Sequence, residues 1–191
     1  MSGLPEFREF PKIARLNREC IISEKIDGTN ACVVITEDGQ VYGQSRNRIL
    51  ITDGDAFGFS LWVERNKDRL RELLGPGYHF GEWWGPGIQR GYATSKEHSN
   101  SMGKRLSLFN VDRWSSLPES SDLKTVPILF RGLFTTDAVI AALARLRIEG
   151  SLASPGFMRP EGVVVFHVAA NVGFKVTLEK DDEHKGRGRE P

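Results

Sequence analysis

The chain has 191 residues, which at a typical ~150 residues per domain favours one domain with a substantial hydrophobic core. Its 26 Lys and Arg residues nearly balance its 25 Asp and Glu residues, and the net charge of +1 excludes a protein held to nucleic acid by bulk charge alone. Apolar residues make up 39% and charged residues 27%, which excludes collagen-like, mucin-like and wholly disordered chains.

The sequence predicts a cytoplasmic protein without a membrane partner. No window approaches the ~18 consecutive apolar residues of a membrane span. Charged Glu6, Arg8 and Glu9 stand where a signal peptide needs its apolar core. The two cysteines, Cys20 and Cys32, form no CxxC pair, so we expect both to be reduced core thiols.

The first quarter of the chain is rich in strand-forming residues. Two such runs, 20–26 and 31–35, are separated by an Asp-Gly-Thr-Asn sequence over 27–30 that favours a turn, because Gly and Asn tolerate positive φ. A second turn over 37–40 leads into a strand over 41–46. We therefore expect a β meander.

The next element is an amphipathic helix. Apolar residues recur at helical spacing over 59–74, and Gly75-Pro76-Gly77 follows as a stop signal. Either Asp53 or Asp55 is available as its N-cap.

The rest of the chain alternates strands with one further helix. We expect strands over 78–84, 106–112, 126–130, 162–168 and 172–178. The helix spans 137–148, with Thr135 or Thr136 as its cap. This order predicts an α+β fold with a mostly antiparallel sheet. We expect one domain over 1–179 and, because charged residues dominate it, a flexible tail over 180–191.

Lys25 is the first candidate for chemistry, in the sequence SEKIDGTN over residues 23–30. A lysine attacks only as the neutral amine, and at an ordinary pKa of ~10.4 little of it is neutral at pH 7. Burial or nearby cations would have to lower that pKa. The segment alone leaves open a solvated lysine at a strand end.

Five segments in order resemble one family. KxDGxN over 25–30 resembles the nucleotidyl-transfer motif of the covalent nucleotidyltransferases, namely DNA ligases, RNA ligases and mRNA capping enzymes. FGEWWGPGIQ over 80–89 resembles the third motif in its RNA-ligase form. Residues 108–112, 161–165 and 174–176 resemble the aromatic strand, the fourth motif and the fifth motif. The likeness is strongest to ATP-dependent RNA ligases of the second bacteriophage type.

This resemblance implies an antiparallel-sheet-rich adenylylation domain of the ATP-grasp-like ligase type. Family members often carry an extra domain after the fifth motif, but few residues follow Lys175 here, so we expect no C-terminal OB domain. It implies three catalytic residues. Lys25 would attack the α-phosphorus of ATP and carry AMP, Glu161 would act through a divalent metal ion, and Lys175 would contact the α-phosphate. The family commonly has two lysines in the fifth motif, whereas this chain has Lys175 alone, so Lys180 or Lys185 could supply the second charge.

The resemblance also implies a nucleotide-binding set. These residues are Glu24, Ile26, Asn30, Arg46, Glu82, Phe109 and Lys175. Glu82 would accept a hydrogen bond from the ribose, and Phe109 would stack on adenine unless it is a core residue. Arg46 would contact ribose or phosphate, with Arg48 as its competitor and a solvated strand end as the alternative.

The expected activity is joining of 5′-phosphate to 3′-hydroxyl ends with ATP and Mg²⁺ or Mn²⁺, a reaction of RNA repair. The GPGIQ sequence favours RNA over DNA as partner, and a partner or second copy supplying a clamp stays open. The alternatives are a DNA or nick-specific ligase, an enzyme that adenylylates ends without sealing, and a binding module without catalysis. Basic residues between Pro86 and Trp114 form either a phosphate-backbone contact or ordinary surface.

Overall fold

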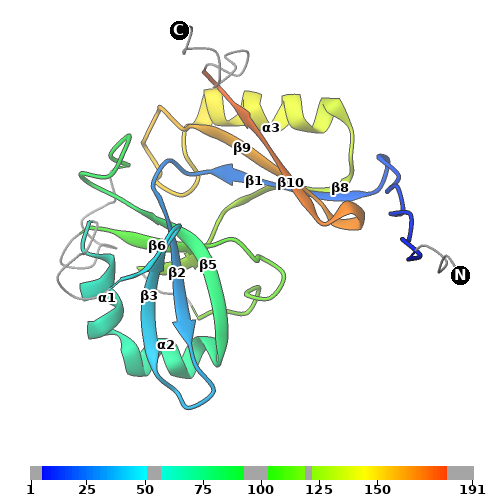
Figure 1. Cartoon of the computed structure of the whole chain (residues 1–191). Helices are drawn as coiled ribbons and strands as arrows, with labels where there is room; N and C mark the ends of the chain where they lie inside the picture. Colours follow the sequence, from blue (N-terminus) through cyan, green and yellow to red (C-terminus); the bar gives the residue numbers. More distant parts are fainter. Residues whose placement is uncertain (1–5, 51–56, 93–102, 119–121, 180–191) are drawn as a thin grey trace, which may run out of the picture.

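The computed structural model describes residues 6–50, 57–92, 103–118 and 122–179. Within these ranges the chain forms two β-sheets, each covered on one face by helices (Figure 1). In Figure 1, sheet A and helix α3 make up the upper part, and sheet B with helices α1 and α2 makes up the lower part. No helix in these ranges is long and apolar enough to cross a membrane.

Sheet A has the strand order β10-β9-β1-β8 and is antiparallel throughout. Its strands are β1 (Glu19–Lys25), β8 (Ile128–Leu133), β9 (Gly162–His167) and β10 (Val172–Thr177). A short 3-10 helix, Val168–Ala170, joins the last two. Helix α3 (Thr136–Glu149) packs Ala142 and Leu146 against Cys20, Ile22 and Val163 of this sheet. These residues form the core of the sheet A half.

Sheet B has the strand order β4-β3-β2-β5-β6-β7, in which only the β6–β7 pair is parallel. Its strands are β2 (Thr29–Ile35), β3 (Val41–Ser45), β4 (Ile49–Leu50), β5 (Gly77–Trp84), β6 (Arg105–Leu108) and β7 (Leu123–Thr125). Helices α1 (Phe59–Arg65) and α2 (Lys67–Leu74) cover one face. Trp62, Leu70 and Trp83 lie in the core between the helices and the sheet.

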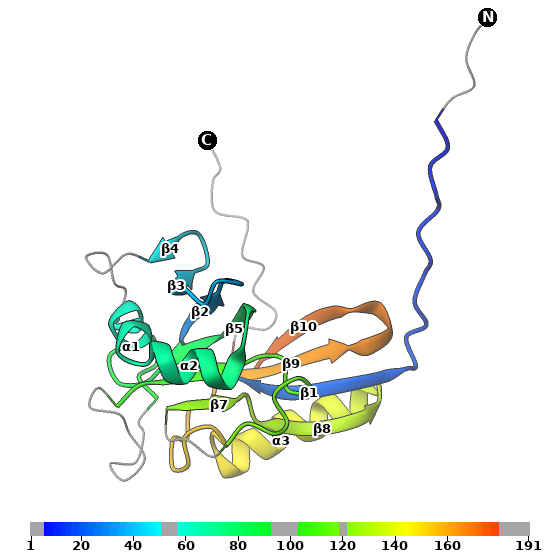
Figure 2. The same cartoon turned by 90° about the horizontal axis from the view of Figure 1, so that it is seen from below.

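A third buried cluster joins the two halves. Ile21 and Ile26, at the start and end of the β1 region, pack with Trp84 and Tyr92 from the sheet B side. Viewed from below, β1 lies between β9 and β8, while the residues before β1 run away from both sheets (Figure 2). The two sheets therefore meet where the chain leaves β1.

Most of the expected elements are confirmed, and so is the α+β class. Helix α3 begins after Thr135, whose Oγ1 accepts a hydrogen bond from the amide of Ala138 at 3.1 Å. Gly75 caps the end of α2 as expected. Cys20 and Cys32 are buried free thiols, and burial raises the pKa of Cys32 to about 11, which keeps the thiol protonated and inert.

The expected β meander is wrong at its first step. Strand β1 pairs with β8 and β9, and β2 pairs with β3 and β5, so the turn over 27–30 crosses from one sheet to the other. The meander begins one strand later, with β2, β3 and β4. The Gly and Asn residues of 27–30 indicate that the chain turns there. They carry no information about which strands pair with β1.

The single helix expected over 59–74 is divided into two. The side-chain amide of Asn66 donates to the carbonyl of Trp62 at 2.7 Å, which replaces a helical backbone contact and ends α1. The proposed caps Asp53 and Asp55 lie outside the described residues, and α1 begins after Gly58 in the left-handed region, φ 82°.

Two strand predictions need correction as well. The strand expected over 106–112 ends at Leu108, because the side chain of Asn110 accepts from the amide of Arg113 at 3.1 Å and turns the chain. The strand expected over 126–130 is interrupted by Pro127, which has no amide proton for a ladder. Strand β7 ends at Thr125, before Val126, and β8 begins at Ile128. The tail over 180–191 lies outside the described residues.

Candidate active site

The crossing between the sheets places Lys25 at their junction. Lys25 is the last residue of β1 and pairs with Gly162 of β9. Ile26 follows it into the cluster between the sheets and is 3% exposed. A Cβ atom at Gly28 would lie 2.4 Å from the carbonyl oxygen of Trp83, so the chain passes close to β5 only because residue 28 is glycine.

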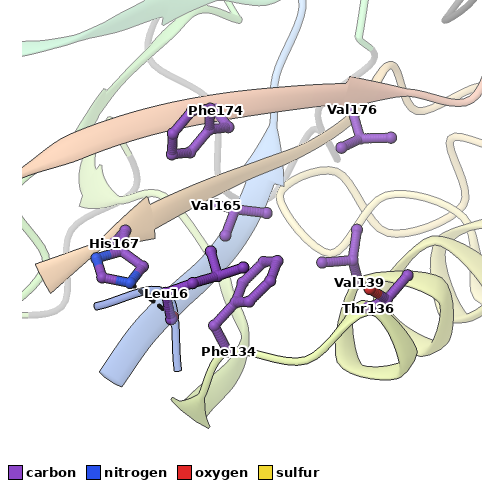
Figure 3. A pocket seen from close by; sticks show the side chains of 8 residues that line it. All are labelled: Leu16, Phe134, Thr136, Val139, Val165, His167, Phe174 and Val176. Carbon is purple, nitrogen blue, oxygen red and sulfur yellow. Dashed lines mark hydrogen bonds between the residues drawn. The ribbon is translucent and has the colours of Figure 1, made fainter. Parts of the chain in front are cut away.

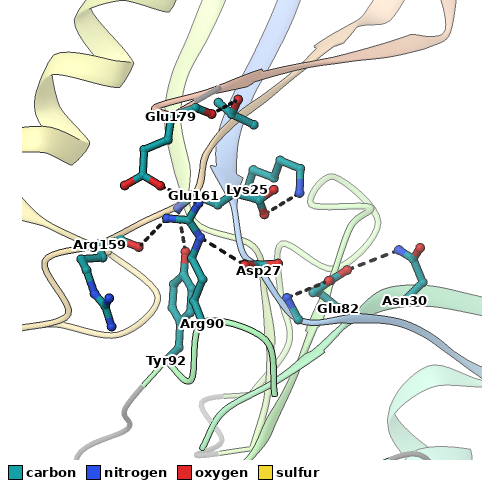
Figure 4. Close-up of polar contacts among 11 residues, drawn as sticks. Lys25, Asp27, Asn30, Glu82, Arg90, Tyr92, Arg159, Glu161 and Glu179 are labelled. Atoms are coloured by element: carbon teal, nitrogen blue, oxygen red, sulfur yellow. Dashed lines mark hydrogen bonds and ion pairs between the residues drawn. The ribbon is translucent and has the colours of Figure 1, made fainter. Parts of the chain in front are cut away.

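Lys25 contacts the carboxylate that the fourth motif supplies. Its Nζ lies 2.5 Å from Glu161 Oε2, and the two side chains are 23% and 15% exposed (Figure 4). The amide of Glu161 donates to the Tyr92 hydroxyl at 2.9 Å. Burial raises the pKa of Tyr92, so this hydroxyl stays neutral. The hydrogen bond to Tyr92 thus fixes the backbone of Glu161 beside Lys25.

Glu82, on strand β5 of sheet B, is a second carboxylate close enough to Lys25 and Glu161 for their charges to act on it. Its Oε1 accepts from the Gly28 amide at 3.0 Å, and its Oε2 accepts from the Asn30 side chain at 3.3 Å. Burial raises the pKa of Glu82 to about 7; the Gly28 hydrogen bond and Lys25 oppose this rise, while Glu161 and Asp27 add to it. Glu82 therefore senses the charges of the Lys25 cluster.

Lys175 shares a face of sheet A with Lys25. Lys175 of β10 pairs with Val164 of β9, which in turn pairs with Ser23 of β1, two residues before Lys25. Because side chains alternate along a strand, these residues point to the face opposite α3. Lys175 is exposed on that face.

Glu24 points to the other side of β1. It is 1% exposed, and its Oε2 accepts from the amides of Leu152 and Ala153, both at 2.9 Å. Its Oε1 has no hydrogen-bond partner among the described residues, and burial raises the pKa of the carboxyl. Glu24 is thus a buried anchor for the loop after α3.

Two members of the predicted set, Arg46 and Phe109, have exposed side chains. Arg46 is exposed in the turn after β3, and no contact with the Lys25 cluster is seen among the described residues. Phe109 follows β6, and its amide donates to the carbonyl of Phe80 at 3.0 Å. At 44% exposed, Phe109 is not a core residue, and its ring is free to stack.

Sequence reasoning missed the arginine beside this cluster. Arg90 Nε lies 3.1 Å from Asp27 Oδ2, and Arg90 Nη2 lies 3.3 Å from Glu179 Oε2. A third contact joins Nη1 to the carbonyl of Arg159 at 3.5 Å. Arg90 is therefore engaged by protein groups and is not a simple part of a phosphate-backbone surface. Two sequence features could have indicated this contact. Arg90 directly follows GPGIQ, and its partner Asp27 is the aspartate of the KxDG sequence.

A cavity on the other side of sheet A does not suit a nucleotide. It encloses about 310 Å³ between the sheet and α3 (Figure 3). Its lining consists of Leu16, Phe134, Thr136, Val139, Val165, His167, Phe174 and Val176. His167 already forms a hydrogen bond with the carbonyl of Leu16 at 2.8 Å, and among the described residues no lysine or arginine lines the cavity to neutralise phosphates.

Comparison of the fold with solved structures finds RNA ligases. A Naegleria gruberi RNA ligase mutant without ligand matches with a TM-score of 0.59 and 20% identity, over 85% of this chain and 50% of that one. Another mutant of that ligase, with ATP and Mn, matches with a TM-score of 0.57 and 20% identity, over 88% and 52%. An archaeal ATP-dependent RNA ligase matches with a TM-score of 0.58 and 19% identity, over 92% and 49%. The chain thus spans about half the length of these proteins.

A comparison of the sequence with family models identifies the family. No curated protein sequence matches significantly. The family model of RNA ligases matches residues 18–177, a range that includes Lys25, Glu82, Glu161 and Lys175. The chain belongs to the RNA ligase family.

Proposed function

We propose that this chain is an ATP-dependent RNA ligase that joins 5′-phosphate and 3′-hydroxyl ends through AMP bound covalently to Lys25. The observation that carries the proposal is the contact of 2.5 Å between Lys25 Nζ and Glu161 Oε2 at the junction of the two sheets, in a chain of this family. Solved relatives hold ATP and Mn or AMP and Mn, which supports the same co-substrate and a divalent metal ion here.

In the first step the Lys25 amine attacks the α-phosphorus of ATP. A new bond joins Nζ to phosphorus, the bond to the β-phosphate oxygen breaks, and pyrophosphate leaves. Since an ammonium has no lone pair, Lys25 must first lose a proton, and Glu161 Oε2 at 2.5 Å is in position to accept it. Lys175, on the same face of sheet A, would offset the charge of the α-phosphate.

The nucleotide would lie between the two sheets. Glu82 and Asn30 suit the ribose hydroxyls, because Glu82 is a hydrogen-bond acceptor already fixed by the Gly28 amide. The exposed ring of Phe109 suits the adenine face. For Glu24, the predicted contact with the nucleotide would require its carboxyl, buried on the opposite side of β1 from Lys25, to become accessible. Arg46 would have to approach from the β3 turn.

The residues fit a hard divalent cation only together with the substrate. Among the described residues no three His, Cys, Asp or Glu side chains form a group that could hold a metal ion. Mg²⁺ and similar ions commonly bind one or two carboxylates together with substrate phosphates, and Glu161 is suited to be one of them. When bound, the ion would neutralise phosphate charge.

Two further steps complete the proposed reaction. The 5′-phosphate of an RNA strand attacks the lysyl-AMP and takes over the AMP, which frees the Lys25 amine. The 3′-hydroxyl of a second end then attacks that 5′-phosphate and expels AMP. Three points stay predictions. They are a role in the cytoplasm, a partner or second copy that clamps the RNA, and the folding of 1–179 as one domain.

The first test is covalent labelling with ATP that carries a radioactive α-phosphate, with Mg²⁺ or Mn²⁺, followed by peptide mapping. We expect metal-dependent label on the Lys25 peptide. Lys25→Ala should take no label, because it lacks the amine that attacks the α-phosphorus of ATP. Lys67→Ala is the matched control, since Lys67 forms an ion pair of the same 2.5 Å length with Glu64 on a helix surface. Label that survives in Lys25→Ala excludes Lys25 as nucleophile.

Sealing assays separate the alternatives. The labelled enzyme is offered matched RNA and DNA strands, single-stranded and nicked. Sealing of RNA ends supports the proposal, and preference for nicked or DNA strands indicates one of the other ligases. Transfer of AMP without sealing indicates an end-adenylylating enzyme. ATP binding without label indicates a module without catalysis.

A further inference from the structure

Arg90 joins three segments that come together around Lys25. One contact goes to Asp27, two residues after Lys25, and one goes to Glu179, two residues after the end of β10. The third goes to the carbonyl of Arg159, two residues before Glu161 (Figure 4). Since Arg90 itself follows β5 and its glycine-rich loop, a single side chain links the Glu82 strand to the segments of Lys25, Glu161 and Lys175.

The planar guanidinium makes this arrangement specific. Arginine presents several N–H groups in fixed directions, so Nε, Nη1 and Nη2 each reach a different partner here. The Asp27 contact is the shielded one, because Arg90 is 25% and Asp27 28% exposed. Glu179 is 62% exposed, so that contact is more strongly screened by solvent.

The charge of Arg90 matters as much as its shape. Asp27, Glu161 and Glu179 are carboxylates around the place where the triphosphate would bind. Arg90 contacts two of them and offsets one unit of their negative charge, and Lys25 pairs with the third. Without Arg90, two uncompensated negative charges would stand beside the entering phosphates.

We propose that Arg90 is a positioning residue for adenylylation of Lys25: it holds the Lys25–Asp27 turn, the Glu161 segment and the end of β10 in register, and its single positive charge partly offsets the two negative charges of Asp27 and Glu179. The proposal rests on the proposed function, since it concerns the same reaction. Arg90 acts through these neighbours and needs no contact with ATP.

The test measures the rate of Lys25 labelling against ATP concentration in Arg90→Ala, Arg90→Lys, Glu179→Gln and the double variant Arg90→Ala/Glu179→Gln. In Arg90→Ala we expect the maximal rate to fall at least about tenfold, because displaced reacting groups lose rate steeply. The apparent KM for ATP should rise too, since two carboxylates repel the phosphates. Arg71→Ala is the matched control: Arg71 also contacts a carboxylate, Asp68, and a carbonyl, Gly39, on the far side of sheet B.

The remaining variants distinguish positioning from stability. Arg90→Lys keeps the charge and loses the three-way geometry, so we expect the KM to recover and the maximal rate to recover only in part. Glu179→Gln should slow labelling less than Arg90→Ala, and the double variant should be no slower than Arg90→Ala alone. Thermal unfolding is recorded for each variant.

Two results would overturn the inference. One is labelling by Arg90→Ala within about twofold of Arg71→Ala at every ATP concentration. The other is a loss in Arg90→Ala that appears only with unfolding, while Arg90→Lys and Glu179→Gln label like the wild type. If the wild-type chain takes no label at all, the proposed function fails rather than the role of Arg90.

Discussion

Among single residues, Glu82 shows best how this fold changes the chemistry of a side chain. Glu82 lies on β5, and its largely buried carboxyl accepts from two donors, the Gly28 amide and the Asn30 side chain of β2. Burial outweighs these donors and raises the pKa from 4.5 to about 7. The group that would bind the ribose is therefore partly protonated near neutral pH.

This shift predicts a pH-dependent stability. Between pH 4.5 and about 7 the folded chain keeps a proton on Glu82 that the unfolded chain has released, so the free energy of unfolding falls as pH rises and is level above that window. In Glu82→Gln this loss is absent, and we expect the variant to gain about 1–3 kcal/mol over the wild type between pH 5 and pH 8. Urea unfolding at a series of pH values measures it.

The control for that experiment is Glu72→Gln, which changes an exposed carboxyl on α2 and should leave the pH profile unaltered. A Glu82→Gln profile parallel to the wild type would mean that Glu82 has an ordinary pKa in the folded chain.

At the scale of elements, helix α3 depends on a cap that the sequence already indicated. Thr135 has extended backbone, φ −141° and ψ 149°, and its Oγ1 accepts from the Ala138 amide at 3.1 Å. We expect Thr135→Ala to lower the free energy of unfolding by about 1 kcal/mol, because the amide loses its partner at the helix start. Chemical denaturation measures the loss, and Thr135→Ser should restore most of it. Equal stability of both variants would show that the cap contributes nothing.

The elements that could be predicted are those with local causes. A capping threonine, a glycine stop after Leu74 and alternating apolar residues each act within a few positions, so α3, the end of α2 and most strands follow from the sequence. The break at Asn66 was missed, because an asparagine side chain competes with the helix only in some contexts. The partners of β1 were missed because pairing depends on strands more than 100 residues away.

The same division holds for the site. The motif residues Lys25, Glu82 and Glu161 could be predicted one by one, and the structure brings them together from both sheets. The roles of Arg90 and Tyr92 could not, since each depends on contacts across 63 and 69 positions of the chain. A basic or aromatic residue after GPGIQ has no meaning until the segments of Asp27 and Glu161 are placed beside it.

At the scale of the whole molecule, two cores are joined by one smaller cluster. The sheet A core is centred on Ile22, Val163 and Leu146, and the sheet B core on Trp62, Leu70 and Trp83. Between them lie Ile21, Ile26, Trp84, Tyr92, Val111 and Val126. Because the proposed chemistry needs Lys25 from one sheet and Glu82 from the other, this cluster must keep the halves in register.

Buried apolar contact between the halves predicts that they unfold together. The four tryptophans, Trp62, Trp83, Trp84 and Trp114, lie in or against the sheet B core or the joining cluster, so their fluorescence reports on that side, whereas far-ultraviolet circular dichroism also reports on α3.

Leu146→Ala removes a side chain of the sheet A core that is 0% exposed. We expect it to cost about 2–5 kcal/mol and to shift the fluorescence and dichroism transitions in urea equally. Leu146→Met, which keeps the volume, should cost less than about 1.5 kcal/mol. A fluorescence transition that stays at the wild-type midpoint while dichroism shifts would show that the halves unfold independently, and that the register of Lys25 and Glu82 depends on the nucleotide rather than on the cluster between the sheets.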